Sequence, residues 1–289
     1  MTDAIRFWGV RGSIASPGPA TARVGGNTSC IEVTLGDKRI ILDAGTGLRQ
    51  LGSAHGALPI DAHLLLSHLH WDHIQGIPFF GPLFNPQSQI HVIGPNAVHQ
   101  ALTRQMSMPT FPIGMDLFAA RLSFEPIQAG ARFKIGEVDV RTAPLNHPGG
   151  AIAYRLSCGD RSLVYACDTE HPAQGIDTNL LELARGVDVL IYDSQYLPEE
   201  YPARVGWGHS TFEKGAELAH EAGVGALILT HHDPSRDDDA VAEIETRARK
   251  LFANSFAAKE GMAVELATIR GGRQSERVER SLAPLPCQA

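Results

Sequence analysis

The sequence predicts an α/β protein in which two β-sheets pack face to face and helices cover their outer faces, a four-layer αββα sandwich. Short apolar runs bounded by Gly, Pro and Asp dominate the first two thirds of the chain. Several of them, such as residues 63–67 and 189–193, are apolar without alternation, which is typical of strands covered on both faces. Helical patterns are fewer and become clearer late in the chain.

The expected strands are short segments of β-branched, aromatic and other apolar residues that end at turn residues. In chain order they are residues 5–10, 29–35, 39–42, 63–67, 89–93, 137–142, 152–157, 162–167, 189–193, 226–230 and 263–266. Their number and spacing fit the two sheets of a sandwich.

Two helices have clear signals. Ser210 to Glu213 matches an S-x-x-E capping box, and the helix that follows is expected to end at Gly223. Residues 237–259 carry apolar side chains at helical spacing and acidic side chains in the first turn, which favours a second helix. Weaker helical patterns cover residues 97–106 and 179–185.

Length and composition predict one large domain. The chain has 289 residues, 43% of them hydrophobic, and a formal charge of −7, which excludes overall disorder and argues against non-specific nucleic-acid binding. We expect a single domain over residues 1–270 and a loosely ordered tail over residues 271–289. The sequence shows no secretory signal, disulfide framework or membrane-spanning stretch, which predicts a cytoplasmic protein without membrane contact.

The most informative segment is residues 67–73, which read SHLHWDH directly after an expected strand. Imidazole nitrogens and carboxylate oxygens are the ligands that borderline divalent cations accept, Zn²⁺ above all. His68 and His70 are two residues apart at a strand end and so point to the same side. Asp72 and His73 follow after a turn and can reach a second position. A chance cluster on a surface loop is the alternative.

Three further polar residues stand at or just beyond the ends of expected strands: His147, Asp168 and His231. Side chains at such positions converge on one rim of a sheet. Each one alone is compatible with a structural role, but together with the SHLHWDH segment they favour a binuclear metal site.

This pattern resembles the metallo-β-lactamase superfamily of binuclear metal hydrolases, and the resemblance extends over most of the chain. Asp43, in the sequence ILDAGTG, fits the first motif of that superfamily and is implied to orient the ligands through hydrogen bonds. The resemblance implies two ligand sets that share Asp168: His68, His70 and His147 for one ion, and Asp72, His73 and His231 for the other.

The departures from common β-lactamases are informative. Those enzymes have Arg where His73 stands and Cys where Asp168 stands, so this chain is more similar to the Asp-bridged hydrolases. Residues 207–211 read WGHST, which is similar to an element of the ribonuclease Z and phosphodiesterase branch. That resemblance implies that His209 contacts phosphate or protonates the leaving oxygen, and that Asp193 orients His209. A simple capping role for His209 is the alternative.

Glycine-rich segments near the N-terminus, residues 9–13 and 23–28, are also similar to this branch. Their backbone N–H groups could approach a phosphate, although glycine-rich turns need no ligand. Four further residues are expected near the substrate or behind the ligands: Arg23, Asn27, Thr28 and His232.

The sequence therefore predicts a hydrolase with two divalent ions, Zn or Mn, while Fe also suits these ligands. The expected substrate is a small phosphodiester such as a cyclic nucleotide, because a charge of −7 without a basic arm disfavours long RNA. Asp72, His209 and Asp193 are the expected catalytic residues. The oligomeric state stays open, and a homodimer is compatible with the sequence.

Two other functions remain open at this point. The first is a lactonase, thioesterase or β-lactamase-like enzyme on the same metals, favoured by the apolar segment from Met106 to Met115. That segment is either a lid over a pocket or a buried connecting loop. The second is a metal-binding module without catalytic activity.

Overall fold

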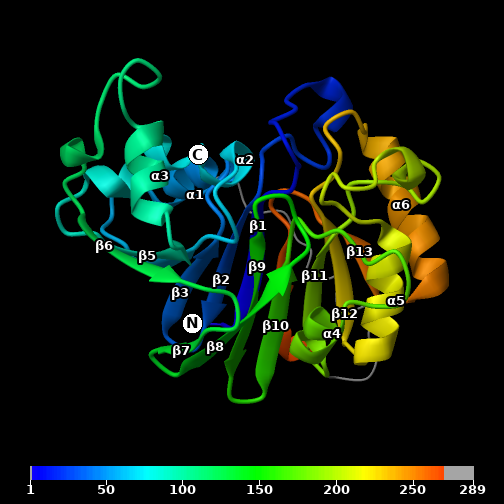
Figure 1. The fold of residues 1–289 in the computed structure, drawn as a ribbon. Coiled ribbons are helices and arrows are strands. Elements are labelled where there is room, and N and C mark those ends of the chain that lie inside the picture. Colours follow the sequence, from blue (N-terminus) through cyan, green and yellow to red (C-terminus); the bar gives the residue numbers. More distant parts are fainter. Residues whose placement is uncertain (1, 270–289) are drawn as a thin grey trace.

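The computed structural model describes residues 2–269, so the tail predicted over residues 271–289 lies outside the described residues. Two seven-stranded mixed sheets face each other, and helices lie on both outer faces (Figure 1). This arrangement confirms the predicted four-layer α/β sandwich. Among residues 2–269, no helix has the length and the apolar character needed to cross a bilayer.

The first sheet has the order β14-β1-β2-β3-β4-β5-β6. The pairs β14–β1, β1–β2 and β2–β3 are antiparallel, whereas β3 to β6 run parallel to one another. The strands are β1 (Ala4–Gly9), β2 (Cys30–Leu35), β3 (Lys38–Leu42), β4 (Asp61–Leu65), β5 (Gln89–Pro95), β6 (Arg121–Ile127) and β14 (Ala263–Glu265).

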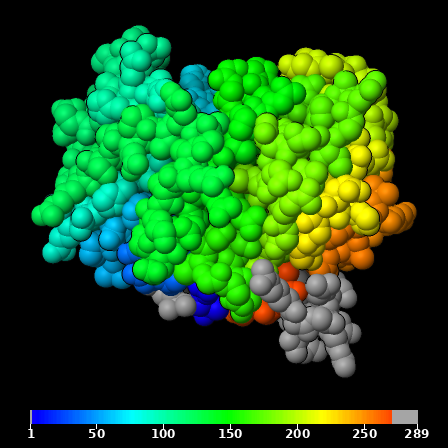
Figure 2. All heavy atoms as spheres, turned by 60° about the horizontal axis from the view of Figure 1, so that its bottom comes forward, coloured from blue at the N-terminus to red at the C-terminus, as the bar shows by residue number. Residues whose placement is uncertain are grey.

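The second sheet has the order β13-β12-β11-β10-β9-β8-β7, with β10 to β13 parallel and β7 to β10 antiparallel. When the lower end of Figure 1 is turned forward, residues coloured green lie in the middle of the molecule, between cyan and blue residues on one side and yellow and orange residues on the other (Figure 2). The strands are β7 (Arg132–Ile135), β8 (Val138–Leu145), β9 (Ala151–Cys158), β10 (Arg161–Ala166), β11 (Val189–Asp193), β12 (Ala226–Thr230) and β13 (Ser255–Ala257).

The helices cover the two outer faces separately. α1 and α3 lie on the side of the first sheet, together with the short α2, and α4 to α6 lie on the side of the second (Figure 1). Their bounds are α1 (Gly47–His55), α2 (Trp71–Ile74), α3 (Val98–Gln105), α4 (Thr178–Ala184), α5 (Phe212–Ala222) and α6 (Asp238–Leu251), followed by α7 (Leu266–Ile269). The apolar faces of both sheets form a shared core between them, which includes Phe7, Leu156 and Ile191.

Each predicted strand is present, with ends that shift by up to a few residues. The sequence reading missed β6, β7 and β13. β6 contains a proline and mostly exposed or half-buried residues, and β13 has only three residues, so neither has a strong apolar pattern. The helix predicted over residues 237–259 ends at Leu251, because the chain turns there to enter β13.

The predicted cap of α5 is wrong by one residue. Thr211, in extended conformation, accepts the hydrogen bond from the Lys214 backbone N–H. Ser210 is buried and its hydroxyl is engaged elsewhere, with Tyr192 and His171. The C-terminal end at Gly223 is confirmed, since this glycine takes the left-handed conformation that ends helices.

The core between the sheets supplies a test of the sandwich. Leu156 on β9 is fully buried there, whereas Leu251 at the end of α6 is 53% exposed. We expect Leu156→Ala to lower the free energy of unfolding by about 2–5 kcal/mol, through lost burial and a residual cavity. Leu251→Ala is the matched control, with a change within about 0.5 kcal/mol. Urea unfolding monitored by circular dichroism measures both, and equal losses for the two variants would contradict the placement of Leu156.

Candidate metal centre

Strands from both sheets end at one rim, and polar residues follow them directly. Asp43 follows β3, Asp168 follows β10 and His231 lies just after β12. Each of the three has a positive φ, 58°, 58° and 61° respectively. This left-handed conformation is costly for residues other than glycine and is concentrated at functional sites. The strained backbone turns these side chains toward a common point at the rim.

The first group of candidate ligands contains three histidines, each from the loop after β4 or the loop after β8. The ligand atoms of His68, His70, His147 and Asp168 lie within 4.8 Å of one another. The Nε2 of His147 is 3.1 Å from the Nδ1 of His70. The Asp168 Oδ2 is 3.5 Å from His68 Nε2 and 3.6 Å from His147 Nε2.

The second group uses the other oxygen of Asp168. The Asp168 Oδ1 lies 3.1 Å from His73 Nε2 and 3.0 Å from His231 Nε2. Asp72 Oδ2 is 3.2 Å from the same two nitrogen atoms. All four residues are buried. The structure thus brings together the seven residues that the sequence singled out, in two groups that meet at one carboxylate.

The chemistry of this cluster fits divalent cations. The Nε2 atoms of His73 and His231 face each other at 3.3 Å, although at most one of them could donate in a direct hydrogen bond. His68 Nε2 and Asp168 Oδ1 are buried, and no residue between 2 and 269 makes a hydrogen bond of good geometry with either atom. Burial lowers the pKa of His68 well below its ordinary value, which keeps the ring in the neutral form that binds metal.

Charge leads to the same conclusion. Four carboxylates are buried at or beside the rim: Asp43, Asp72, Asp168 and Asp193. Among residues 2–269, their ion pairs are to histidines alone. Buried carboxylates need compensating positive charge or they neutralise. Cations held between the histidines would supply that charge.

Asp43 holds the ligand His73 from behind. Its carboxylate accepts hydrogen bonds from His73 Nδ1 at 2.8 Å, from the Tyr165 hydroxyl at 2.7 Å, and from both the backbone N–H and the hydroxyl of Ser67 at 2.7 Å. With Nδ1 bound in this way, Nε2 of His73 faces the cluster. Ser67 and Tyr165 lie inside strand-like apolar segments, so no sequence signal marked their role.

The glycine-rich segment after β1 closes one side of the cluster. The Ser13 backbone N–H donates to Asp72 Oδ2 at 2.8 Å. A Cβ on Gly12 would lie 2.5 Å from both His231 Nδ1 and Gln195 Oε1, so only glycine fits there. The contact that this segment makes with the cluster is therefore through the candidate ligand Asp72.

His209 and Asp193 form a pair next to the second group. The Nδ1 of His209 donates to Asp193 Oδ2 at 2.8 Å, and its ring stacks on His231 with the centroids 5.0 Å apart. Burial alone would lower the pKa of His209, but the charge of Asp193 and the hydrogen bond outweigh it and raise the pKa to about 9. Because Thr211 caps α5, the ring of His209 has no capping role.

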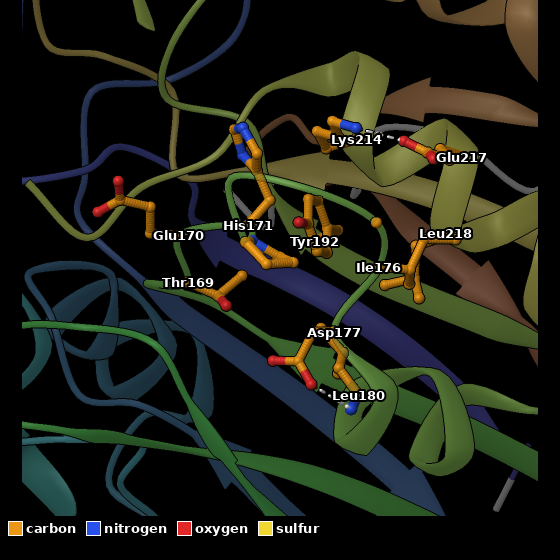
Figure 3. Close-up of a pocket in the computed structure, with 12 residues that line it drawn as sticks. Thr169, Glu170, His171, Ile176, Asp177, Leu180, Tyr192, Lys214, Glu217 and Leu218 are labelled. Atoms are coloured by element: carbon orange, nitrogen blue, oxygen red, sulfur yellow. Dashed lines mark hydrogen bonds and ion pairs between the residues drawn. The ribbon is translucent and has the colours of Figure 1, made fainter. Parts of the chain in front are cut away.

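Glu170 anchors the loop that carries His209, and the sequence reading did not identify it. Thr169, Glu170 and His171 lie on the loop after β10 (Figure 3). The carboxylate of Glu170 accepts from the backbone N–H groups of Gly206 at 2.7 Å and Gly208 at 2.9 Å, and from the Tyr201 hydroxyl at 2.7 Å. Only its position two residues beyond Asp168 could have drawn attention to it.

The loop that carries His209 also orients His147. The Nδ1 of His147 donates to the Gly208 carbonyl at 2.9 Å, while the Glu170 backbone N–H donates to the Asn146 carbonyl at 2.8 Å. Gly208 has φ +84°, and a Cβ there would lie 2.3 Å from His147 Nδ1. Glu170 therefore connects the His147 loop with the His209 loop through contacts that leave no room for a side chain at Gly208.

Four residues predicted near the substrate or behind the ligands have other partners. Arg23 is 68% exposed and pairs with Asp238 and Asp239 at the start of α6. Asn27 binds Glu260 through its backbone and its side chain. The hydroxyl of Thr28 contacts Thr46 and Gln75, and His232 Nε2 donates to the Ala258 carbonyl at 3.0 Å. The structure does not bring these side chains into the cluster.

Comparison with known proteins agrees with this geometry. The model of the beta-lactamase superfamily domain matches residues 38–232. Ribonuclease Z from Mycobacterium sp. (strain KMS) is 30% identical over 259 residues, which cover 82% of this chain and 88% of that protein. Ribonuclease Z from Archaeoglobus fulgidus is 27% identical over 318 residues, covering 92% and 98% respectively.

Solved structures share the fold at lower identity. The metallo-beta-lactamase fold protein YhfI from Bacillus subtilis has a TM-score of 0.69 at 21% identity, covering 90% of this chain and 97% of that one. The short form of human tRNase Z has a TM-score of 0.66 at 16% identity, covering 91% and 99%. The family match and the ribonuclease Z relatives establish that the chain is a hydrolase of the metallo-β-lactamase superfamily, on its ribonuclease Z-like branch.

Proposed function

We propose that the protein is a binuclear metal-dependent phosphodiesterase that acts on a small phosphodiester such as a cyclic nucleotide. The observation that carries this proposal is the position of the His209–Asp193 pair next to a carboxylate, Asp168, that two ligand groups share. A proton donor beside two cation positions suits the cleavage of a phosphate ester, in which charge develops on both the phosphoryl and the leaving oxygens.

Two divalent ions, Zn or Mn, are the proposed cofactors, and Fe also suits nitrogen and oxygen ligands. Each ion would have three ligands of its own and share the Asp168 carboxylate. The sets are His68, His70 and His147 for one ion, and Asp72, His73 and His231 for the other. When bound, such ions neutralise phosphate oxygens and make the attacking water more acidic.

The residues of the chain divide the remaining work. Asp72, held by the Ser13 N–H, would help to hold one ion and accept a hydrogen bond from the attacking water. His209 keeps its Nδ1 proton on Asp193, so its Nε2 is the atom that gives a proton to the leaving oxygen as the P–O bond breaks. Glu170 is a positioning residue, since it fixes the backbone next to His209.

A small substrate is favoured over long RNA by charge. The chain carries a net charge of −7, whereas a surface that binds a long phosphate backbone needs clustered Lys and Arg. The relatives named ribonuclease Z differ from the proposal on this point, so a comparison of tRNA precursors with cyclic nucleotides as substrates separates the two.

Hydrolysis of a carboxylic ester or thioester is the second candidate. It is favoured by an apolar cavity beside α2, to which Thr110 and Phe111 of the segment from Met106 to Met115 contribute. A thiolate needs little protonation when it leaves, so the His209–Asp193 pair favours the phosphodiester over a thioester.

Removal of one ligand tests the metal assignment. We expect purified wild-type protein, loaded with Zn or Mn, to hold two ions per chain and to hydrolyse bis(p-nitrophenyl) phosphate. His231→Ala should hold fewer ions and lose at least about a hundredfold in turnover, because its site would lack a ligand. His220→Ala, an exposed histidine on α5, is the matched control and should keep both properties. Full metal content in His231→Ala would refute the ligand set.

Leaving groups of different basicity test His209. A cyclic nucleotide releases a basic alkoxide, whereas p-nitrophenolate leaves without help. His209→Ala should therefore slow hydrolysis of the cyclic nucleotide about 10²–10⁴-fold and that of bis(p-nitrophenyl) phosphate far less, with metal content unchanged. An equal loss on both substrates would rule out the role of proton donor, and dominant turnover of a lactone would favour the second candidate.

The same pair of substrates tests Glu170. In Glu170→Gln, one carboxylate oxygen becomes an NH₂ group that faces a backbone N–H of Gly206 or Gly208. We expect a loss of about 10–100-fold with the cyclic nucleotide and a smaller one with the p-nitrophenyl ester, since an oriented His209 matters only for the basic leaving group. Glu217→Gln on the surface of α5 is the control. Parallel losses with lower metal content would show that Glu170 acts on His147 alone.

A further inference from the structure

A cavity of about 720 Å³ lies beside the candidate metal centre, and the phosphodiesterase function proposed above gives it no role. It is formed by α2, by α3 and by the segments that follow them. Its walls include Trp71, Phe79 and Phe111, together with the polar side chains of Arg104 and Gln105. The volume falls within the range typical of pockets that hold small molecules. We call it the aromatic cavity.

The aromatic walls are open to solvent. Trp71 is 77% exposed and Phe79 is 57% exposed. Phe79 and Phe111 meet edge to face, with ring centroids 5.9 Å apart, although they lie on separate segments of the chain. Large aromatic side chains that are exposed together around a cavity are typical of a ligand-binding groove.

The aromatic cavity and the metal centre share one helical turn. In α2, Asp72 and His73 are buried in the cluster, while Trp71 lines the aromatic cavity. His70, just before Trp71, is the exposed member of the first ligand group. A molecule whose phosphate lies at the ligands can therefore place an attached group against Trp71.

The lining favours a planar heteroaromatic group over an alkyl chain. Aromatic faces stack on nucleobases, whose rings all offer a π-face. Arg104, Gln105 and Thr110 add a guanidinium, an amide and a hydroxyl to the same lining. The Gln105 amide oxygen is buried and, among residues 2–269, accepts no hydrogen bond. An N–H group of a base can donate to it, whereas a hydrocarbon chain cannot.

We propose that the aromatic cavity binds the nucleobase of the substrate, stacked on Trp71 and Phe79, while the phosphodiester lies at the metal centre. This proposal rests on the phosphodiesterase function proposed above. It gives the segment from Met106 to Met115 a definite role, since its Thr110 and Phe111 form one wall of the aromatic cavity. The substrate class is then a nucleotide diester rather than a simple alkyl diester.

Three diesters with the same leaving group test the assignment: the p-nitrophenyl phosphates of thymidine, of ethanol and of hexanol. The wild type should prefer the thymidine ester over the ethyl ester by about tenfold or more in kcat/KM. Phe79→Ala and Phe111→Ala should each lower kcat/KM for the thymidine ester about tenfold, mainly through KM, and leave the ethyl ester nearly unchanged. Phe84→Ala is the control, because this exposed phenylalanine packs on Phe118 outside the aromatic cavity.

The other outcomes overturn the assignment in distinct ways. Equal losses on all three esters would show a structural role for the two phenylalanines. A preference for the hexyl ester as strong as that for thymidine would replace the nucleobase with a general apolar group. Calorimetric titration of the metal-loaded protein with thymidine monophosphate separates the phosphodiesterase function from nucleobase binding in the aromatic cavity. If Phe79→Ala weakens binding of the monophosphate but no diester is hydrolysed, the phosphodiesterase function is refuted and the nucleobase site is kept. If all three diesters are hydrolysed at equal rates, the nucleobase site is refuted and the phosphodiesterase function is kept.

Discussion

The carboxylate of Asp168 is the point on which the rest of the centre depends. One oxygen lies against His68 and His147, and the other lies against His73 and His231. A residue in this place must face two groups at once, which explains why the backbone adopts a positive φ there, at some cost in conformational energy. The sandwich makes that cost tolerable, because the strand before the strained turn, β10, is hydrogen-bonded on both sides, to β9 and to β11.

The sequence could identify the residues whose chemistry, metal binding, requires particular residue types at particular spacings. Imidazoles and carboxylates at ligand spacing are rare enough that SHLHWDH, His147, Asp168 and His231 were found together. Residues that act through a backbone group leave no such pattern. Glu170 binds two N–H groups whose place depends on the tertiary fold, and Tyr165 reaches Asp43 across the core. The sequence also does not reveal that Asp238 and Asp239, at the start of α6, pair with the Arg23 side chain.

The same contrast holds for the fold. Strands buried on both faces, such as β11 and β12, were predicted with their observed bounds because their apolar runs are continuous. β13 has three residues and could be recognised only from its pairing with β12. The cap of α5 went to Thr211 rather than Ser210 because Tyr192 and His171 already hold the Ser210 hydroxyl. Which residue caps the helix is decided by competition for the Ser210 hydroxyl, and the competing residues lie outside the local capping motif.

The distribution of the candidate ligands over two sheets has a mechanical consequence. His68, His70, Asp72 and His73 follow a strand of the first sheet, whereas His147, Asp168 and His231 follow strands of the second. Any cation held between them is also a reversible cross-link between the two halves of the sandwich. Folding stability and cation supply are then linked by mass action, with each ion adding stability as its free concentration rises above its dissociation constant. The same ions would therefore serve both the proposed reaction and the stability of the fold.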